Sequence, residues 1–494
     1  MKRLVALILA AILLVGALPF AGAAFKDAES IDKKYKAAVT AMSDQKIIGG
    51  FEDGTFGPEK TLTRAQAAKI LCVMLEGEEK ANALTKTETG FADVPASHWA
   101  AKYIAYCVDK GIVAGVGEGK FDPNGTLSSG AFAKMLLVAY GEDGAKFTGA
   151  DWLKNVQTAA AEPNFLLFNL KEVSTAGASR QEACQMAFNA KFWSEAKAAK
   201  ANAVEKPMYT GVPRSLKLLV VGNSFGNDCS LNYLYQLLQE AGVKEIVIGT
   251  LYYSGCSFQQ HTTFGLTDQA VYKYYKNTTG KAKQIGKKQT SAYALKDEKW
   301  DVLIVSTGFK RGYPESYHPW QDAELYYLQQ ACPDAIFGFN STWACRSDST
   351  HKSYISLYNQ DQKKQYDMGN AAVQSEVLTE KRYSFVLPTG TAVQNARTSF
   401  LGDHLDRDGY HMNKGIGRYT VAMVLCCKLT GVDPDTLTYL PDAIVQDKKD
   451  YTIPGQNMKA PGLKEALGKV ARESVKNAIA KPFEVTQSQN TVAP

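Results

Sequence analysis

Residues 215–432 alternate between short apolar runs and amphipathic stretches. The apolar runs are rich in β-branched and aromatic residues and lie at 216–221, 245–251, 301–306, 335–340 and 383–388. After the first run, Leu231, Leu234 and Leu238 recur at three- and four-residue spacing, as the buried face of a helix does. Strands that alternate with helices predict a parallel sheet covered on both faces. In such sheets the ligand site lies at the carboxyl ends of the strands.

The N-terminal part contains an internal repeat. Residues 47–71 and 112–136 align without a gap, and both pass from a Gly-rich turn through a Phe-x-Pro segment into a helical pattern. Thr63 and Ser128 precede these helices, where a side-chain oxygen can accept hydrogen bonds from free amides. A degraded third copy is predicted within 148–195. One such unit cannot bury its apolar face alone, so we expect the copies to pack on one another.

This pattern resembles the S-layer homology domain over residues 25–195, with copies at about 25–80, 91–145 and 148–195. The resemblance implies a mainly α-helical module that binds a secondary cell-wall polysaccharide non-covalently. Arg64 and Arg180 match the family's arginine, which meets an anionic ketal, and a guanidinium pairs with a carboxylate in two places. Alternatively, Arg64 is only a first-turn surface residue. Ser129 stands at the equivalent place in the second copy, which therefore lacks the cation.

The first residues predict export. A basic start at Lys2 and Arg3, an apolar run at 4–15 and small residues at 21–24 are typical of a secretory signal peptide, here residues 1–24. That run is too short to span a bilayer, and no later stretch is long and apolar enough to do so. We therefore expect a secreted protein that is held at the cell wall or S-layer by its repeats.

Composition narrows the class of protein. A chain of 494 residues is too long for one ordinary core, and its 45% hydrophobic and 21% charged residues are typical of globular domains. The net charge of +6 suits an anionic wall polymer but does not indicate a nucleic-acid partner. Nine cysteines lack the paired spacing of a disulfide scaffold or a zinc site, so we favour buried free thiols.

A serine directly follows the first predicted strand, in Gly-Asn-Ser-Phe at 222–225. Such a turn exposes the hydroxyl of Ser224, while the free amides and positive end of the next helix can face an oxyanion. The second strand ends in Tyr-Ser-Gly-Cys at 253–256, where Gly255 lets the backbone approach a substrate oxygen. Each of these two signals is weak alone.

A histidine near the end of the sheet domain supplies a candidate base. Asp408 and His411 are three residues apart across a predicted turn, just before the last helix of the domain. A catalytic base needs an acid that fixes its tautomer and stabilises its charged form, and this spacing can bring the two side chains together.

Taken in this order, the serine block, the glycine block and the terminal Asp-x-x-His resemble the SGNH (GDSL-like) hydrolase superfamily, in a little-characterised bacterial branch, over about 215–432. The resemblance implies an α/β flavodoxin-like three-layer sandwich that hydrolyses acyl esters without a metal or another cofactor. It makes Ser224 the nucleophile, His411 the general base and Asp408 its orienting acid. The amides of Ser224 and Gly255 would donate to the oxyanion.

One block departs from the superfamily pattern. After the third strand the superfamily usually offers an Asn side chain as a third oxyanion donor, whereas this chain has Ser-Thr-Gly-Phe at 306–309. Loss of one such donor costs about 100- to 1,000-fold in rate. A hydroxyl from Ser306 or Thr307 can substitute, as a less preorganised donor.

Further candidate residues lie near strand ends. A substrate pocket is expected to include Asn223, His261, Trp343 and Asn395, although packing explains His261 and Trp343 equally well. The segment 273–288 carries six lysines and no acid, which indicates either a solvated loop or contact with an anionic glycan. Residues 196–214 are predicted as a linker. Residues 433–494 are predicted as a C-terminal extension, partly helical and then loose.

The sequence therefore predicts a cell-surface-anchored serine esterase that deacylates a polysaccharide or another carbohydrate ester, with acetyl as the leading acyl group. The alternative is a glycan-binding or structural wall protein whose hydrolase fold turns over weakly or not at all.

Overall fold

The structure is a computed structural model that describes residues 25–161, 165–446 and 457–494. The chain divides into two compact units, with the boundary between Ala198 and Ala199. The predicted signal peptide lies outside the described residues. Within the described ranges, no helix combines the length and apolar character needed to cross a membrane.

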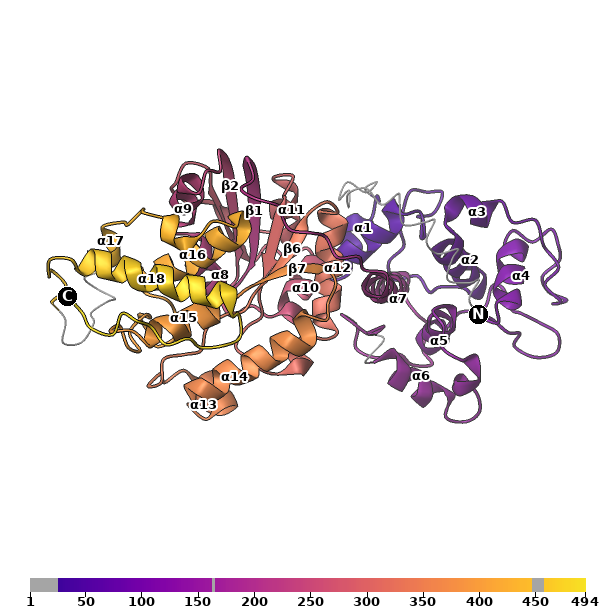
Figure 1. Cartoon of the computed structure of the whole chain (residues 1–494). Helices are drawn as coiled ribbons and strands as arrows, with labels where there is room; N and C mark the ends of the chain where they lie inside the picture. Colours follow the sequence, from indigo (N-terminus) through magenta and orange to yellow (C-terminus); the bar gives the residue numbers. More distant parts are fainter. Residues whose placement is uncertain (1–24, 162–164, 447–456) are drawn as a thin grey trace. The chain divides into compact units, whose positions relative to one another are not determined.

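The first unit is built from helices joined by turns (Figure 1). They are η1 (Ala28–Ser30), α1 (Lys36–Asp44), α2 (Arg64–Glu76), α3 (Glu78–Asn82), α4 (Ala101–Asp109), α5 (Ser129–Ala139), η2 (Gly144–Phe147), α6 (Trp152–Ala160) and α7 (Arg180–Ala201). Thr63 caps α2, and its hydroxyl and the Gln66 side chain each accept a hydrogen bond from the other's backbone amide. Ser128 caps α5 in the same position of the next repeat.

The first two repeats also share a pair of side-chain hydrogen bonds. The carboxylate of Asp27 accepts hydrogen bonds of 2.7 and 2.8 Å from the amides of Phe56 and the residue after it. Asp93 does the same with Phe121 and its successor, at 2.8 and 2.7 Å. Repeated sequence has therefore produced repeated structure, down to single hydrogen bonds.

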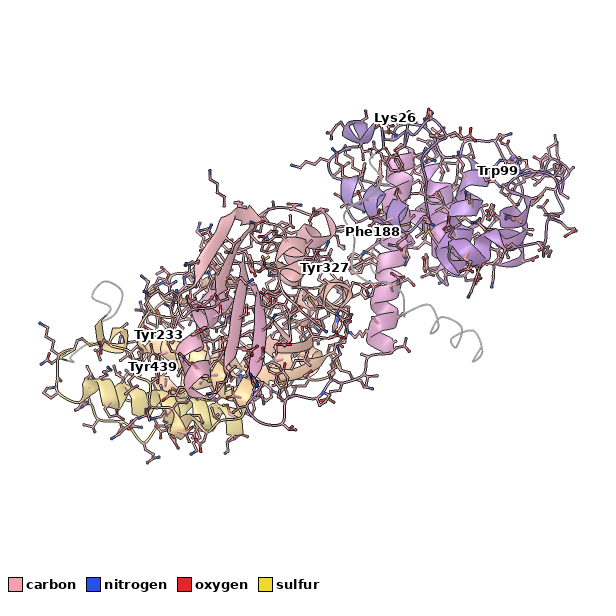
Figure 2. The ribbon with its side chains drawn as sticks, turned by 90° about the horizontal axis from the view of Figure 1, so that it is seen from above. Lys26, Trp99, Phe188, Tyr233, Tyr327 and Tyr439 are labelled. Atoms are coloured by element: carbon pink, nitrogen blue, oxygen red, sulfur yellow. The ribbon has the colours of Figure 1, made fainter. Side chains whose placement is uncertain are left out.

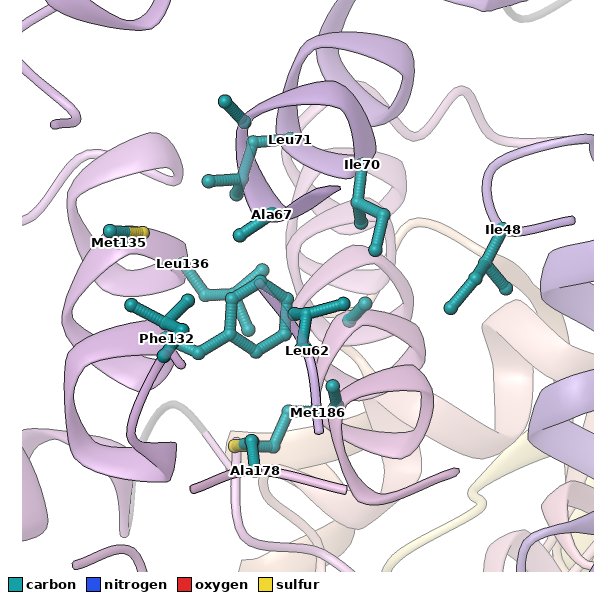
Figure 3. Close-up of a cluster of buried hydrophobic side chains, with 14 of the residues drawn as sticks. Ile48, Leu62, Ala67, Ile70, Leu71, Phe132, Met135, Leu136, Ala178 and Met186 are labelled. Carbon is teal, nitrogen blue, oxygen red and sulfur yellow. The ribbon is translucent and has the colours of Figure 1, made fainter. Parts of the chain in front are cut away.

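A ring of backbone hydrogen bonds joins the two repeats and the predicted third copy. The amide of Leu62 donates to the carbonyl of Ala178 (2.9 Å), that of Ala178 to Leu127 (3.0 Å), and that of Leu127 back to Leu62 (2.8 Å). These residues precede the caps of α2, α7 and α5, and side chains from the three helices meet in one buried cluster (Figure 3). The degraded third copy, within 148–195, is the segment that closes this ring.

Trp99 lies in the first unit (Figure 2). It is 53% exposed, and its ring packs beside that of His98. Helix α7 continues to Ala201, six residues past the predicted end of the repeats at 195.

All nine cysteines are buried free thiols, which confirms the prediction from their spacing. Burial raises the pKa of Cys72 and Cys332 to about 12. Because the thiolate is the reactive form, these two side chains behave as small apolar groups.

The second unit contains a seven-stranded sheet, counted over its described residues. Its strands are β1 (Ser215–Gly222), β2 (Glu245–Tyr252), β3 (Tyr272–Asn277), β4 (Lys283–Gln289), β5 (Val302–Val305), β6 (Ile336–Asn340) and β7 (Tyr383–Leu387). The order is β4-β3-β2-β1-β5-β6-β7. β1 pairs in parallel with β2 and β5, and the parallel pairing continues through β6 to β7.

The five parallel strands have the order of a flavodoxin-like sheet. Chain order reverses direction at β1, since β2 lies on one side of it and β5 on the other. Ligands of such sheets bind outside the carboxyl ends of the strands at this switch point. The predicted serine block directly follows β1 and so lies at that place.

Helices cover both faces of the sheet (Figure 1). They are α8 (Ser224–Ser230), α9 (Leu234–Glu240), α10 (Phe258–Leu266), α11 (Ser291–Lys296), η3 (Pro314–Ser316), α12 (Trp320–Ala331), α13 (Lys352–Tyr358), α14 (Gln362–Ala372), η4 (Val373–Val377), α15 (Thr389–Arg397), α16 (Ile416–Thr430), η5 (Pro434–Thr436), α17 (Ala443–Gln446) and α18 (Leu463–Ala480). Helices α8, α9, α15, α16 and α18 pack on one another over one face, and α10 to α12 do so over the other. Alternate residues of β1, such as Leu216, Leu218 and Val220, enter the core with α16 and α18.

The lysine-rich segment 273–288 is an edge hairpin rather than a loop. Tyr272 and Tyr274 are buried while Lys273 between them is exposed, so β3 has the alternation of a half-buried strand. β4 forms the sheet edge, and exposed lysines on an edge strand oppose pairing with other chains.

The described end of the C-terminal extension, residues 457–494, packs on the sheet domain instead of ending loosely. Helix α18 contributes Leu467, Val470 and Val475 to the core of the sheet domain. Beyond it, the amide of Ser488 donates to the hydroxyl of Thr398, and the carbonyl oxygen at position 490 accepts a hydrogen bond from the amide at 400. The tail therefore belongs to the second unit.

His261 lies in α10, where it packs on β3. Its ring stacks on Tyr272 with centroids 5.6 Å apart, and its Nδ1 is 2.9 Å from the Tyr272 hydroxyl. Among the described residues its Nε2 is buried without a hydrogen-bond partner. Burial lowers the pKa of His261 to about 3.

We predict that His261 weakens the fold in acid. Its folded pKa lies below the unfolded value of about 6.5, so the unfolded state binds the proton first and stability falls as the pH drops below 6.5. Between pH 7 and pH 5 the free energy of unfolding of the wild type should fall by about 2 kcal/mol more than that of His261→Gln, as measured by urea titration of the full chain. Equal losses in the two proteins would contradict the neutral, buried imidazole.

We also predict that two adjacent glycines respond differently to alanine. A Cβ on Gly50 would lie 2.7 Å from the carbonyl oxygen of Thr55 and 2.8 Å from the Phe25 ring, whereas a Cβ on Gly49 meets nothing within 4 Å. Gly50→Ala should lower the free energy of unfolding by about 1–3 kcal/mol. Gly49→Ala should leave it within about 0.5 kcal/mol of the wild-type value. Urea unfolding of the full chain, followed by hydrogen exchange over residues 25–198, measures both. Similar costs would show that the repeat turn tolerates the clash.

Candidate active site

Ser224 is the first residue of α8, immediately after β1. Asn223 is the N-cap, and its side chain accepts a hydrogen bond from the amide of Phe225 (3.0 Å). A helix's first amides have no intrahelical acceptor, so the Ser224 amide is free to meet an anion. The strand-to-helix turn predicted from sequence is therefore present.

The buried side chain of Asn223 ties three strand-end loops together. Its amide group donates to the carbonyl of Cys256 after β2 (3.1 Å) and to that of Thr307 after β5 (3.2 Å). Both of its polar atoms are thus engaged with backbone. Asn223 therefore holds the three loops together, and its side chain does not face a substrate.

Gly255 lies at the surface beside these loops. Its φ of +65° is a left-handed conformation that glycine adopts readily. A Cβ on Gly308 would lie 3.3 Å from the Gly255 carbonyl oxygen, so the loops after β2 and β5 approach closely. Ser306 and Thr307 are buried in this region, and a Cβ on Gly222 would lie 3.2 Å from the Ser306 hydroxyl.

Asp408 and His411 form the expected pair. The His411 Nδ1 lies 2.7 Å from a carboxylate oxygen of Asp408, and the His411 amide donates to the other oxygen at 2.8 Å. Burial alone would raise the pKa of Asp408, but the hydrogen bonds from His411 lower it overall. Because a carboxylate only accepts, Nδ1 carries the proton and Nε2 of the neutral ring is left as the base.

The His411 ring lies beside the start of α8. Its centroid is 6.3 Å from that of Phe225, the residue after Ser224. No hydrogen bond joins Ser224 and His411 in the part of the chain that the structure describes. Catalytic hydrogen bonds are often long before a substrate binds. The structure thus brings the serine, the histidine and the aspartate to one end of the sheet.

Aromatic rings continue from His411 along the same end of the sheet. Tyr410 packs on His411 (4.0 Å between centroids) and His351 packs on Tyr410 (4.7 Å). His351 stacks flat on Phe309, with centroids 4.0 Å apart and an interplanar angle of 3°. The half-buried rings of Phe309, His351 and Tyr410 were not predicted as part of the site. Only Phe309 stood in a motif that was singled out in the sequence, next to Gly308.

His351 presents a defined donor. Its Nδ1 accepts a hydrogen bond from the amide of Ser353 (3.2 Å), which leaves the proton of the neutral ring on Nε2. Burial, followed by the nearby His411, lowers the pKa of His351, so the ring is neutral at pH 7.

The remaining predicted pocket residues are buried in contacts of their own. Trp343 is fully buried, and its Nε1 donates to the carbonyl of Tyr410 (2.7 Å), which supports the histidine loop. The side chain of Asn395 bonds the backbone of Ser474 and Thr486 in the C-terminal extension. His261 bonds Tyr272 on β3. None of these hydrogen bonds reaches Ser224 or His411.

The two predicted wall-binding arginines bridge repeats within the first unit. Arg64 donates to the carbonyls of Phe121 and Ala114, each at 2.7 Å, and its side chain is partly exposed. Arg180 is 4% exposed and makes the equivalent bonds to Phe56 (2.8 Å) and Gly49 (2.7 Å). Burial lowers the pKa of both guanidinium groups.

Comparison with known proteins agrees with this division of the chain. The family model described as S-layer homology domain matches residues 24–68 and 90–133. The model described as Domain of unknown function (DUF4886) matches residues 217–453. A "Cell surface protein" of Thermoanaerobacter kivui is 33% identical over 155 residues, which are 31% of this chain and 20% of that protein. The matched region thus spans only a fifth of that relative.

Two solved structures are similar to the second unit. A DUF4886 family protein from Bacteroides uniformis is 29% identical, covers 56% of this chain and 100% of its own, and has a TM-score of 0.48. A candidate SGNH hydrolase from Slackia heliotrinireducens is 14% identical, covers 43% of this chain and 97% of its own, and has a TM-score of 0.29. Both scores lie below 0.5, so the fold assignment rests on the sheet order and helices described above.

The S-layer homology matches and the cell-surface relative support association with the cell wall or S-layer. The N-terminal part of the chain thus matches the S-layer homology domain model twice, and the part that follows matches the DUF4886 family model over residues 217–453.

Proposed function

We propose that the second unit is a serine ester hydrolase of the SGNH type, held at the cell surface by the first unit. The observation that carries this proposal is the Asp408–His411 pair beside the N-terminus of α8, where Ser224 begins the helix at the switch point of the sheet. A base with a fixed tautomer, a serine at a helix start and free amides are the parts that acyl transfer needs.

In the proposed reaction, His411 Nε2 takes the proton of the Ser224 hydroxyl as its oxygen attacks the ester carbonyl. Asp408 stabilises the imidazolium that forms. The tetrahedral oxyanion lies against the amides of Ser224 and Gly255, at the positive end of α8. His411 then protonates the leaving alcohol, and water, activated by the same ring, releases the acid from Ser224.

The third oxyanion donor differs from the Asn side chain that is usual in the superfamily. Thr307 is the proposed third donor, because its carbonyl is anchored by Asn223 and its residue adjoins the Gly255 loop through Gly308. A hydroxyl rotates, so it is less preorganised than an amide held in place. We therefore expect a slow enzyme compared with relatives that keep all three donors.

The proposed substrate is an acylated carbohydrate, with acetyl as the leading acyl group. The half-buried rings of Phe309, His351 and Tyr410 offer flat apolar surface next to the base, and His351 adds an N–H donor. Sugar rings present apolar C–H faces and hydroxyl oxygens that suit these groups. A wall-associated chain would meet such esters on wall or extracellular polysaccharide.

Replacing Ser224 should abolish turnover. Ser224→Ala is expected to lower kcat on p-nitrophenyl acetate by about 10⁴-fold or more, to background. Asp408→Asn should cost roughly 10²-fold, less than the 10⁴-fold typical of a buried acid, because 40% of the Asp408 side chain is exposed. A fluorophosphonate probe should label wild type and Ser375→Ala, which alters an exposed serine on η4, but not Ser224→Ala. Labelling that persists in Ser224→Ala would contradict the assignment.

The second candidate function is a glycan-binding or structural wall protein without turnover. The departure at Ser306 and Thr307 favours it, since one oxyanion donor of the superfamily is missing. This function predicts binding of acetylated xylan or peptidoglycan by a protein that neither releases acetate nor reacts with the probe. Acetate release that depends on Ser224 would eliminate it.

For anchoring, we propose that Arg64 contacts the anionic wall polysaccharide, while the more buried Arg180 supports the neighbouring repeat. Arg64→Ala should release the full chain from isolated cell walls in a sedimentation assay. Lys69→Ala removes an exposed positive charge from the same helix and should leave the protein bound. Far-UV circular dichroism checks that both variants are folded; retention of a folded Arg64→Ala would show that the anchor lies elsewhere.

A further inference from the structure

Helix α8 carries a second group that reaches the histidine loop. Asp228 lies one turn after Ser224, and its side chain is 1% exposed. One carboxylate oxygen accepts a hydrogen bond of 2.8 Å from the amide of Met412, the residue after His411. The serine's own helix therefore holds the loop that carries the base.

Two arginines complete this link. The other oxygen of Asp228 lies 2.5 Å from the NH2 nitrogen of Arg418 in α16, and 3.4 Å from the NH1 nitrogen of Arg407. Arg407 also donates from its side chain to the carbonyl of Met412, and from its amide to that of His411 (2.9 Å). Asp228 thus holds the amide of Met412 directly, and it holds the carbonyl of Met412 through the side chain of Arg407.

Asp408 cannot perform this task. It lies on the same loop as His411, so its hydrogen bond sets the tautomer and ring orientation but not the place of the loop over Ser224. Gly409, with φ of +91°, lies between the two residues. A contact that reaches from α8 to Met412 is what couples the serine and the histidine in space.

We propose that Asp228 is a positioning residue that holds His411 above Ser224 and supplies a second negative charge near the imidazolium. This inference rests on the proposed esterase function. A buried carboxylate is stable only with compensating partners, and Arg407 and Arg418 provide them. A misplacement of about 1 Å can cost about 100-fold in rate, so a buried group that fixes the base affects turnover more than substrate binding.

The charges around His411 determine the expected effect of pH. Its own loop brings Asp408 and Arg407, α8 brings Asp228, α16 brings Arg418, and His351 faces it from the segment before α13. Removal of the Asp228 charge leaves the positive charges of Arg407 and Arg418 without their carboxylate partner. These charges then disfavour the protonated form of His411, so the acid limb of kcat/KM should move to lower pH.

Asp228→Asn in the full chain tests the proposal, since the amide oxygen can still accept from Met412. With p-nitrophenyl acetate, kcat should fall about 10- to 100-fold while KM changes less than about threefold. The acid limb should move down by roughly half a pH unit or more. Arg407→Met removes a positive charge instead, and the acid limb should move up.

Asp322→Asn is the matched control. Asp322 is a largely buried carboxylate in α12 that pairs with Arg382 at 2.7 Å, so its loss costs stability without touching the site. If Asp228→Asn matches Asp322→Asn in kcat and in pH profile, Asp228 is only structural and the proposal fails. If both charge variants move the acid limb in the same direction, it also fails. Absence of Ser224-dependent hydrolysis in wild type would overturn the proposed function and this inference together.

Discussion

The parallel pairing of β1 with β2 on one side and β5 on the other is the constraint on which the candidate site depends. It brings the ends of three strands side by side, so that Ser224, Gly255 and Thr307 emerge at one edge although the chain separates them widely. Asn223 then joins the three loops with its buried side chain. Without that register, Ser224 and the amides proposed to bind the oxyanion would not share a site.

The histidine is positioned by different means. It lies on a loop before α16 and not at a strand end, and this loop is held from several directions. Trp343 donates to the carbonyl of Tyr410, Asp228 accepts from the amide of Met412, and Asp408 fixes the ring. The site therefore combines a rigid sheet edge with a loop whose place depends on buried polar contacts.

The first unit follows a simpler principle. Each repeat offers one capped helix and one turn, and the two repeats close a ring with the predicted third copy through the backbone of Leu62, Leu127 and Ala178. The arginine of one copy bonds the turn of another, so the residues expected to meet the wall polymer also hold the module together. Wall binding and stability of the module are consequently hard to separate at Arg180, and easier at the more exposed Arg64.

Much of this could be predicted from sequence where a signal is local. The five predicted apolar runs correspond to the five parallel strands, and the predicted capping residues stand at the starts of their helices. The three-residue spacing of Asp408 and His411 correctly indicated the hydrogen bond between them. The β3–β4 hairpin was missed because its lysines hid the alternation of Tyr272 and Tyr274.

Contacts between distant segments gave no such signal. Asp228 meets Met412 184 residues later in the chain, and His351 meets Phe309 across two loops. Asn395 was expected in the pocket because it follows a strand, yet the C-terminal extension engages its side chain. Spacing along the chain cannot show which of several strand-end residues turns inward, since that depends on what packs against it.

We propose that Ser224 and His411 act together on one substrate above the sheet. A crystal structure of the protein after reaction with a phosphonate ester tests this pairing most directly. We expect a covalent bond to the Ser224 oxygen, a phosphonyl oxygen about 3 Å from the amides of Ser224 and Gly255, and His411 Nε2 within hydrogen-bond reach of the adduct. An unmodified Ser224, or a His411 ring directed to a separate surface, would contradict it.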